Sequence, residues 1–503
     1  MSARPSPLLS RLVGHPIATD VAVIGPDGVA GGAGTYGAIG ARARALSAIL
    51  RGPRRSLDGA RVAFLLPQER SYVDALLGIL LAGGCAVPIS PLHTGAEIEH
   101  VVRDADPIAL MTNTALSPRL EALRDARPLI LTDARTPAAL VHDSACSADA
   151  PAMMLYTSGT TGRPKGVVLT HGGIAATLTS LEEAWRWRRR DRLLHVLPLH
   201  HTHGVIVALL GALWAGATAQ LLPFDAERTW ELFADSTVFM GVPTMYHKLM
   251  EAHRAADEGK RARWSLAAKK LRLATSGSAA LPASLLAEFE QATGQVILER
   301  YGMTEIGMAL SNPYDGARVP GAVGVALPGV EVDLVGDDGA LAKVDEPGEL
   351  RVRSPQMFAG YHGDRASTEA SFDEQRRFRT GDTGVRDERG VVKLLGRTSV
   401  DVLKSGGYKL SALEIEEALR AHPSIAEVAV IGVPDETWGD AVTACVVLRQ
   451  GCSLELEALR EWAKQSLAPY KVPRALHVID ALPRNAMGKV QKTSLRDRFV
   501  TST

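Results

Sequence analysis

The chain has 503 residues, which is too long for a single compact hydrophobic core and predicts at least two domains. Hydrophobic residues make up 46% and charged residues 22%, a composition typical of soluble globular proteins. The 56 Lys and Arg residues are balanced by 56 Asp and Glu residues, which argues against a nucleic-acid-binding protein with a basic surface stripe.

The four cysteines, Cys85, Cys146, Cys445 and Cys452, are scattered along the chain and form no CxxC pair. This spacing predicts neither a disulfide framework nor a zinc site, and it fits a reducing compartment. No apolar run reaches the roughly 18–20 residues that cross a bilayer, so we expect no membrane insertion.

The N-terminal segment allows two interpretations. It carries Arg4 and Arg11 among several serines, and no acidic residue precedes Asp20, which weakly resembles an organelle transit peptide. We favour a short disordered lead-in to the first domain. We therefore predict a cytoplasmic protein, with the mitochondrial matrix as the alternative.

The first three-quarters of the chain alternate short apolar runs with helical stretches. Residues 61–67 (RVAFLLP) predict a buried strand, residues 69–81 a helix with an apolar face, and residues 85–89 the next strand. Further strands are predicted at 108–111, 129–131, 153–156, 193–197, 218–222, 237–241, 271–275 and 295–299. Alternation on this scale implies parallel sheets covered by helices.

The pattern changes after about Asn312, where glycine and proline become frequent. Alternating runs at 331–335 and 349–352 predict antiparallel strands, which would form a small barrel or meander closing the large domain. A compact tail from Ser399 predicts a small α+β domain. Its helices are predicted at 412–420 and 454–466, and its strands at 427–432, 442–448 and 475–479. The domains are thus placed at 1–398 and 399–503.

The sharpest local signal is YTSGTTGRPKG at 156–166, directly after a predicted strand. Glycines let backbone N–H groups turn toward an anion, hydroxyl groups donate further hydrogen bonds, and a lysine supplies positive charge. The spacing differs from the GxxxxGK[ST] pattern of P-loop NTPases, so we predict a phosphate-binding loop of another class. Its predicted ligands are Thr157, Ser158, Gly159, Thr160, Thr161, Gly162 and Lys165.

This loop resembles the phosphate-binding signature of the adenylate-forming superfamily of acyl-CoA synthetases, luciferases and peptide-synthetase adenylation domains. Six further segments resemble its other signatures in the same order: PLHHTHG at 198–204, SGSAALP at 276–282, YGMTE at 301–305, FRTGD at 378–382, the stretch 396–411, and PRNAMGK at 483–489. The resemblance covers roughly residues 35 to 492. It implies an α/β N-terminal domain of stacked, mostly parallel sheets with a small mobile α+β C-terminal domain.

The resemblance also implies a reaction: ATP activates a carboxylate as an acyl-AMP, and the acyl group then passes to coenzyme A. Thr304 would contact the α-phosphate of ATP, and Glu305 would bind Mg²⁺ as a hard oxygen ligand. Lys489 would reach the carboxylate and the α-phosphate during adenylation, although alone it resembles a solvated surface lysine. The segments around adenine and the phosphates comprise Gly277, Ser278, Ala279, Tyr301, Gly302 and Met303.

In the same resemblance Asp382 would accept both ribose hydroxyls, and Arg397 would hold the ribose or a phosphate nearby. Considered alone, Asp382 is equally well a turn-forming residue after Gly381. For the thioester step the family rotates its C-terminal domain and exchanges the lysine loop for a CoA-binding face. That face would comprise Lys404, Ser405, Gly406, Gly407 and Tyr408. The pivot falls at Ser399, where the family usually has Asp or Lys, and Asp401 is the alternative.

The acyl pocket is predicted to be polar. His200, His201 and His203 cluster before Gly204 but lack the spaced partners of a zinc site, and one of them would suit a core position. Long-chain or aromatic acids need an apolar pocket, whereas histidines and an arginine suit a small anionic acid. The second carboxylate of a diacid would need a bidentate guanidinium, because burying an unpaired charge costs several kcal/mol.

Arg300 is the predicted partner of that carboxylate, with Arg318 as the second candidate; a surface ion pair with Glu299 is the alternative for Arg300. The remaining predicted substrate ligands are His201, His203, Ser276 and Ser278, and His201 is also assigned to the catalytic set. ERYGMTE, SNPYDGARVPGAVG and GRTSVDVLKSGGYKLSALEIE closely resemble malonyl-CoA synthetases, some of which also take methylmalonate.

We therefore predict an AMP-forming acid–thiol ligase that uses ATP, Mg²⁺ and coenzyme A, with malonate as the acid. A synthetase for another short, medium-chain or aryl acid is the nearest alternative. A luciferase-like oxygenase, an adenylation module and a non-catalytic nucleotide-binding relative are more distant ones. The expected partners are small molecules, with no nucleic acid.

Overall fold

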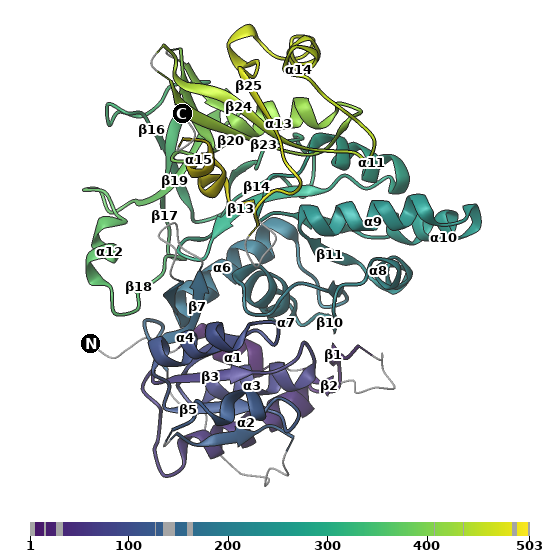
Figure 1. Ribbon diagram of the computed structural model, residues 1–503. Helices are drawn as coiled ribbons and strands as arrows, with labels where there is room; N and C mark the ends of the chain where they lie inside the picture. Colours follow the sequence, from purple (N-terminus) through teal and green to yellow (C-terminus); the bar gives the residue numbers. More distant parts are fainter. Residues whose placement is uncertain are drawn as a thin grey trace. The chain divides into compact units, whose positions relative to one another are not determined.

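The computed structural model describes residues 6–14, 17–26, 34–125, 127–133, 146–157, 164–406, 408–435, 437–484 and 490–500. The chain divides into two compact units, drawn in Figure 1 with colours that follow the sequence. The N-terminal unit comprises Met1–Arg318, Ala326–Glu331 and Arg353–Arg376. The C-terminal unit comprises Val319–Val325, Val332–Val352 and Arg377–Thr503. The boundary predicted after Thr398 falls inside the second unit and stays a prediction.

Seven strands form the first sheet of the N-terminal unit: β3 (Arg61–Leu65), β4 (Cys85–Ile89), β5 (Ala109–Thr112), β6 (Leu129–Leu131), β7 (Pro151–Thr157), β8 (Lys165–Thr170) and β18 (Gly360–Tyr361). Their order is β18-β8-β7-β4-β3-β5-β6. The neighbours from β7 to β6 pair in parallel, and β8 pairs antiparallel with both β7 and β18.

Strand β3 is almost wholly apolar because helices cover both faces of the sheet. Ala63 and Leu65 pack against the amphipathic helix α4 (Gly95–Ala105). Phe64 points to the opposite face, where its ring lies 4.9 Å from that of Tyr72 on α3 (Arg70–Leu81). Helix α2 (Tyr36–Arg51) packs beside α3. The short helix α5 (Pro118–Glu121) precedes β6.

Nine strands form the second sheet: β1 (Val21–Ile24), β2 (Gly34–Thr35), β9 (Arg192–His195), β10 (Thr218–Leu221), β11 (Val238–Gly241), β12 (Leu273–Ser276), β13 (Leu298–Met303), β14 (Gly307–Ser311) and β15 (Val325–Ala326). Their order is β15-β14-β13-β12-β11-β9-β10-β1-β2. The strands from β13 to β1 in this order are parallel. The carboxyl ends of neighbouring parallel strands therefore lie at one edge, where β12 and β13 carry several predicted site residues.

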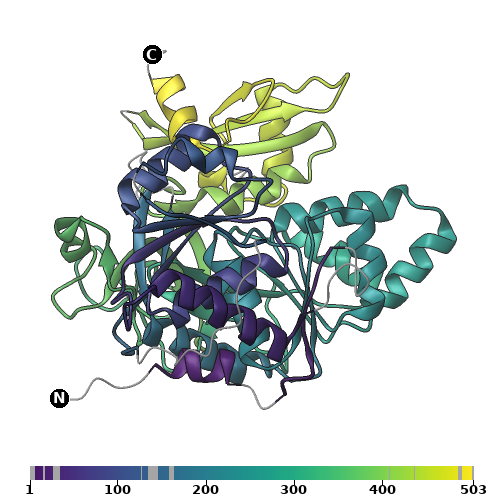
Figure 2. The same ribbon diagram turned by 90° about the horizontal axis from the view of Figure 1, so that it is seen from below.

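Four helices gather around an aromatic cluster beside this sheet: α8 (Ala226–Leu232), α9 (Pro243–Ala255), α10 (Glu258–Ala268) and α11 (Ala283–Thr293). Figure 2 shows these teal helices side by side. Trp230 of α8 stacks on Trp264 of α10 with ring centroids 5.8 Å apart. Other helices of this unit include α6 (His171–Trp185), the π-helix His203–Leu210, α7 (Gly211–Trp214) and α12 (Arg365–Ala370).

The predicted disordered lead-in is wrong for the described part of the N-terminus. Residues Pro7–Val13 form helix α1, whose Leu8, Leu9 and Leu12 are buried. Ser6 caps the helix, and Arg11 forms an ion pair with Glu182 of α6. Apolar residues spaced one and four apart give α1 a buried face, and burying that face offsets the entropy lost on ordering. Ser2 and Arg4 lie outside the described residues.

Two sheets form the C-terminal unit. The first consists of β16 (Glu331–Val335), β17 (Gly348–Arg353), β19 (Phe378–Arg386) and β20 (Val392–Arg397), in that order, and corresponds to the predicted small barrel or meander. The second contains β21 (Val402–Ser405), β22 (Tyr408–Ser411), β23 (Ile425–Asp435), β24 (Gly439–Leu448) and β25 (Ala475–Val478). Its order is β22-β21-β24-β23, and β25 pairs in parallel with β24.

Strand β23 shows why this second sheet is apolar on both faces. Val428 and Val430 pack in the core that includes α13 (Ala412–Arg420) and α14 (Leu456–Ala463). The alternate residues Ala429 and Ile431 pack with Leu495 of α15 (Lys492–Val500). The two-residue period of a strand places these sets on opposite faces, so helices cover both sides of the sheet.

The predicted fold class is confirmed, and most predicted strands differ from the observed ones by a few residues. β13 is the informative exception, because it continues four residues beyond the predicted end at Glu299. None of the described helices has the length and apolar character needed to span a bilayer.

Candidate active site

A group of buried polar side chains in the N-terminal unit comes from the end of β12, from within β13 and from the start of the π-helix. The side chains of Ser276, Arg300 and His203 are 1%, 4% and 6% exposed. Among the described residues, Nε and Nη2 of Arg300, both ring nitrogens of His203 and Oγ of Ser276 have no hydrogen-bond partner. Buried polar atoms are normally paired, so this group has the character of a binding site for a polar ligand.

The charges of Arg300 and His203 indicate which kind of ligand this group of side chains would bind. Burial lowers the pKa of Arg300 to about 10, which still leaves the guanidinium charged near neutral pH. Burial and the charge of Arg300 hold the pKa of His203 well below its usual range, so that ring is neutral. One buried cation beside neutral hydrogen-bonding groups favours an anion. The alternative for Arg300, a surface ion pair with Glu299, is wrong because Arg300 is only 4% exposed and therefore does not lie at the surface.

Arg318, the second predicted candidate, is occupied elsewhere. Its guanidinium donates to the main-chain oxygens of Pro313, Tyr314 and Val296. These bonds fix the loop that follows β14. They leave Arg300 as the better placed arginine for a ligand anion.

The other histidines of the predicted acyl segment, His200 and His201, lie against each other with their rings tilted by 47°. The rings of His200 and His201 lie 4.0 Å apart, and the ring of His93 lies 5.0 Å from that of His200. Burial, followed by the neighbouring histidines, lowers the pKa of His200 to about 2 and that of His201 to about 4. These rings are therefore neutral at physiological pH. The described residues contain no group of three or more His, Cys, Asp or Glu that could hold a metal ion.

Thr304 and Glu305 follow β13 and are held by residues remote in the sequence. The Thr202 hydroxyl donates to Oγ1 of Thr304 at 2.9 Å, and the Tyr361 hydroxyl donates to Oε1 of Glu305 at 3.1 Å. The main-chain oxygen of Glu305 accepts from the amide of Phe358. Thr202 lies in the predicted acyl segment PLHHTHG but was given no role there, and no local pattern marks Tyr361.

Glu305 fits the predicted Mg²⁺ ligand. Its carboxylate is buried and oriented by a hydroxyl donor. Mg²⁺ is commonly held by one or two carboxylates together with substrate phosphates rather than by a cage of protein ligands. A single oriented carboxylate is consistent with that arrangement.

Adenine-segment residues around β13 are closely packed. Tyr301 is buried, and Gly302 pairs with Met308 across the β13–β14 hairpin. A Cβ at Gly302 would lie 2.3 Å from the main-chain oxygen of Gly307, so this position requires glycine. Met303 is half-buried, and Ser278 and Ala279 are exposed. Ser278 has a positive φ of 69°, so the chain turns sharply after the buried Ser276 and Gly277.

The structure describes only the two ends of the predicted phosphate-binding loop. Thr157 ends β7 and pairs in register with Lys165, which begins β8. The ammonium of Lys165 lies 3.1 Å from Oδ2 of Asp364 and donates to Ser367 at 2.8 Å. It also lies over the ring of Tyr361, at 5.1 Å from the centroid. The predicted ligands Ser158, Gly159, Thr160, Thr161 and Gly162 lie outside the described residues.

In the C-terminal unit, β19 and β20 place the predicted ribose ligands Asp382 and Arg397 opposite each other. Nε of Arg397 lies 3.1 Å from Oδ1 of Asp382, and Nη1 donates to the main-chain oxygen of Thr380 at 2.6 Å. The amide of Asp382 donates to Oγ1 of Thr380. Asp382 is thus an oriented carboxylate in a strand, which supports the ribose interpretation over that of a simple turn residue.

The predicted CoA face is a hairpin formed by β21 and β22. Lys404 is exposed, and Ser405 is buried with no partner for its hydroxyl among the described residues. Gly406 has a φ of 57°, a backbone conformation that favours glycine. The ring of Tyr408 stacks on that of Tyr470 at 4.3 Å. Gly407 and Lys489 lie outside the described residues.

The chain is thus an α/β protein with a buried cation at Arg300, an oriented carboxylate after β13 and a second carboxylate on an antiparallel sheet. Residues 16–362 match the AMP-binding enzyme family, and residues 414–489 match the AMP-binding enzyme C-terminal domain. The chain belongs to the AMP-binding enzyme family.

Several relatives resemble the chain over most of its length. It is 45% identical to the mitochondrial malonate–CoA ligase of Mus musculus, covering 89% of this chain and 83% of the relative. It is 41% identical to the malonate–CoA ligase of Arabidopsis thaliana, covering 88% and 78%. ATP-bound MatB from Rhodopseudomonas palustris is 34% identical and superposes with a TM-score of 0.88, with 99% of each chain covered. A malonyl-CoA ligase complexed with methylmalonyl-CoA and AMP is 36% identical, with a TM-score of 0.70 and coverage of 95% and 100%.

Proposed function

We propose that this protein is an ATP-dependent malonate–CoA ligase that forms a malonyl-adenylate and transfers the malonyl group to coenzyme A. The observation that carries the proposal is the buried Arg300 guanidinium, whose Nε and Nη2 have no hydrogen-bond partner in the part of the chain that the structure describes. A dicarboxylate presents one carboxylate to ATP and the other to this cation, which removes the cost of an unpaired buried charge. The malonate–CoA ligases among the relatives support the same substrate.

In the first half-reaction, a carboxylate oxygen of malonate attacks the α-phosphorus of ATP, and pyrophosphate leaves. Negative charge builds on the phosphate oxygens, so the residues act by positioning and by electrostatic stabilisation. Thr304 donates to the α-phosphate, Asp382 and Arg397 hold the ribose, and Lys489 supplies a cation. Glu305 would hold Mg²⁺, which would supply positive charge to the phosphates.

In the second half-reaction, the thiolate of coenzyme A attacks the acyl carbon, and AMP leaves with its phosphate oxygen. The face that begins at Lys404 serves this step, and Lys489 serves only the first. Because the two steps use different residues, we propose that the C-terminal domain moves as a rigid body between them. We place the boundary of this domain at 398/399. Methylmalonate, which differs by one methyl group, is proposed as a second substrate, and the complex of a related ligase with methylmalonyl-CoA supports this.

A panel of carboxylic acids tests the proposed substrate. Each acid is incubated with ATP, Mg²⁺ and coenzyme A, and AMP release that depends on both co-substrates is measured. Malonate is expected to give the highest kcat/KM, with methylmalonate next and acetate, propionate, medium-chain and aryl acids far below. Preference for a medium-chain or aryl acid would contradict the malonate assignment while leaving an acyl-CoA synthetase.

The compartment is also part of the proposal. The relatives from mouse, frog, human and cattle are named as mitochondrial, which favours the mitochondrial alternative over the predicted cytoplasmic location. Cell fractionation combined with N-terminal sequencing of the native protein tests this. Deletion of the first residues would be a poor test, because α1 is buried against the rest of the N-terminal unit.

A further inference from the structure

The C-terminal unit contains a buried ionic cluster that none of the proposed chemistry uses. The ammonium of Lys492, the first residue of α15, lies 2.6 Å from Oδ1 of Asp401 and 2.6 Å from Oε1 of Glu416. The side chain of Lys492 is 9% exposed and that of Glu416 is 8% exposed. Two carboxylates share one cation, so loss of the ammonium would leave two buried like charges together.

Asp401 links this cluster to the turn between β20 and β21. Its Oδ2 accepts from the amide of Arg397 at 3.1 Å, and its own amide donates to the main-chain oxygen of Arg397 at 2.7 Å. The turn is therefore closed by both the side chain and the main chain of Asp401. A Cβ at Gly396 would lie 2.3 Å from Cβ of Asp401, so the close approach requires glycine. Ser399, the predicted pivot, lies inside this turn.

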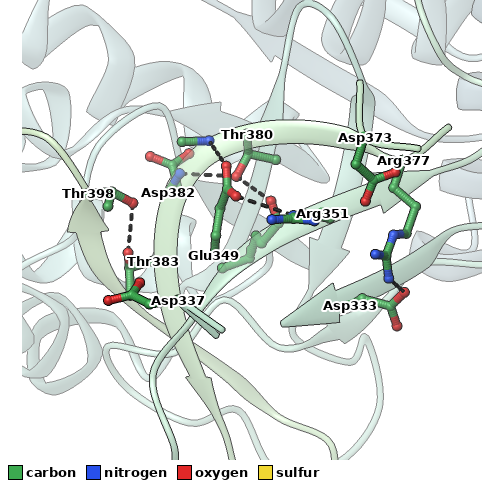
Figure 3. A network of polar contacts seen from close by, with 12 residues as sticks. Asp333, Asp337, Glu349, Arg351, Asp373, Arg377, Thr380, Asp382, Thr383 and Thr398 are labelled. Carbon is green, nitrogen blue, oxygen red and sulfur yellow. Dashed lines mark hydrogen bonds and ion pairs between the residues drawn. The ribbon is translucent and has the colours of Figure 1, made fainter. Parts of the chain in front are cut away.

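The contacts continue in both directions from the turn. On one side, the Arg397 guanidinium forms an ion pair with Asp382, the proposed ribose ligand. The hydroxyl groups of Thr398 and Thr383 are hydrogen-bonded to each other (Figure 3). On the other side, Oε1 of Glu416 accepts from the amide of Val430 in β23 at 2.8 Å. A continuous series of ion pairs and hydrogen bonds thus joins Asp382, the turn at residues 397–401 (the pivot turn) and strand β23 of the C-terminal unit.

Lys492 also follows closely after the proposed cation of the first half-reaction. Only two residues separate it from Lys489 in the sequence. Arg484 and Val490 form a β-bridge on either side of residues 485–489. The ammonium of Lys492 therefore ties the pivot turn to the chain that immediately follows Lys489.

We propose that Lys492 is a positioning residue that acts through Asp401: it fixes the pivot turn to the start of α15 so that Lys489 is presented correctly for adenylation. This role rests on the proposed function, since it assumes two half-reactions of which the first alone uses Lys489. Glu416 stabilises Lys492 but does not touch the turn. The two carboxylates consequently have different roles, although each binds the same ammonium.

Two substitutions separate these roles. Asp401→Asn keeps the Lys492–Glu416 ion pair, but asparagine has one acceptor oxygen and cannot serve both the Arg397 amide and the ammonium. Glu416→Gln is the matched control, because it removes one carboxylate from Lys492 and leaves Asp401 in contact with both the ammonium and the turn. Lys492→Met removes the ammonium, and Lys492→Arg restores a cation.

Adenylation is measured as malonate-dependent exchange between pyrophosphate and ATP without coenzyme A. The thioester step is measured in reverse, as AMP-dependent release of free coenzyme A from malonyl-CoA. For Asp401→Asn and Lys492→Met we expect adenylation to fall by about 10- to 100-fold, the loss typical of a misplaced catalytic group, and the thioester step to fall much less. Glu416→Gln should lower the unfolding temperature and leave the ratio of the adenylation rate to the thioester rate unchanged. Lys492→Arg should bring this ratio most of the way back from its value in Lys492→Met to that of the wild type.

Equal losses in both half-reactions for Asp401→Asn, or the same change of ratio in Glu416→Gln, would overturn the positioning role. Failure of the proposed function is detected separately in the wild-type protein. If the wild type exchanges pyrophosphate with another acid instead of malonate, the substrate proposal fails, and the same ratio is then measured with that acid and its thioester.

Discussion

A Cβ atom at Gly277 would lie 2.4 Å from Cζ of Arg300, so the guanidinium occupies space that any other residue would fill. Gly277 follows the last residue of β12, and Arg300 lies within β13, its parallel neighbour. The missing side chain on one strand thus makes room for the cation on the next. This relationship places Gly277 against Arg300, the proposed ligand of the second carboxylate, whereas the sequence analysis placed it only beside adenine.

Arg300→Ala should lower kcat/KM for malonate by about 10²-fold, which corresponds to the roughly 3 kcal/mol of a lost charged hydrogen-bond pair. The same change should harm acetate or propionate less, because these acids offer no second carboxylate. Steady-state kinetics with both kinds of acid measure the difference. Arg318→Ala is the control: it breaks bonds to three main-chain oxygens and should lower stability without changing the preference. A preference that Arg300→Ala leaves intact would contradict the assignment.

Gly277→Ala should weaken the preference for malonate as Arg300→Ala does, although the guanidinium is still present. The added methyl group displaces the guanidinium, so kcat/KM should fall more for malonate than for propionate. Gly95→Ala provides a matched control, because a Cβ there meets nothing within 4 Å. If Gly277→Ala reduces both acids equally and raises KM for ATP, its main role is at the nucleotide instead.

Tyr361→Phe should weaken the binding of Mg²⁺ through Glu305. The phenol donates to Oε1 of Glu305 and orients the carboxylate, and loss of such an outer partner typically costs 10- to 100-fold in metal affinity or activity. We expect a higher Mg²⁺ concentration at half-maximal rate and a near-normal rate at saturating Mg²⁺. An unchanged Mg²⁺ titration would show that Tyr361 does not influence Mg²⁺ binding.

Buried histidines should make the protein less stable as the pH falls from about 6.5 toward 4. Burial lowers the pKa of His171 from 6.5 to about 4, so in this window the unfolded chain binds a proton that the folded chain does not. Stability therefore falls with pH, by up to about 1.4 kcal/mol per pH unit for one proton. Denaturant unfolding of the wild type and His171→Gln at several pH values tests this: the variant should show a shallower dependence, and an equal slope would contradict the cause.

Local sequence predicted where the strands lie along the chain, because continuous apolar runs mark buried parallel strands. It could not predict contacts between residues that are distant in the chain. β13 extends to Met303 because β14 pairs with it antiparallel, and this extension carries Arg300 into the core. The partners of Lys165 lie about two hundred residues away, at Asp364 and Ser367. The Asp401–Lys492 pair likewise joins residues 91 positions apart, and no motif marks it.

Lys489→Ala should separate the two half-reactions more completely than any other single substitution. Lys489 is proposed to stabilise charge that develops when the carboxylate attacks the α-phosphate, and losing one such stabilising group typically costs about 10²–10³-fold. Pyrophosphate exchange should therefore almost disappear. The thioester step involves no attack at phosphorus by the carboxylate, so AMP-dependent release of coenzyme A from malonyl-CoA should remain close to the wild-type rate. Lys471→Ala is a suitable control, because that lysine also belongs to the C-terminal unit but is paired with Glu414. Equal damage to both half-reactions by Lys489→Ala would show that this lysine supports folding or nucleotide binding in general, and the proposed division of residues between the two steps would then be wrong.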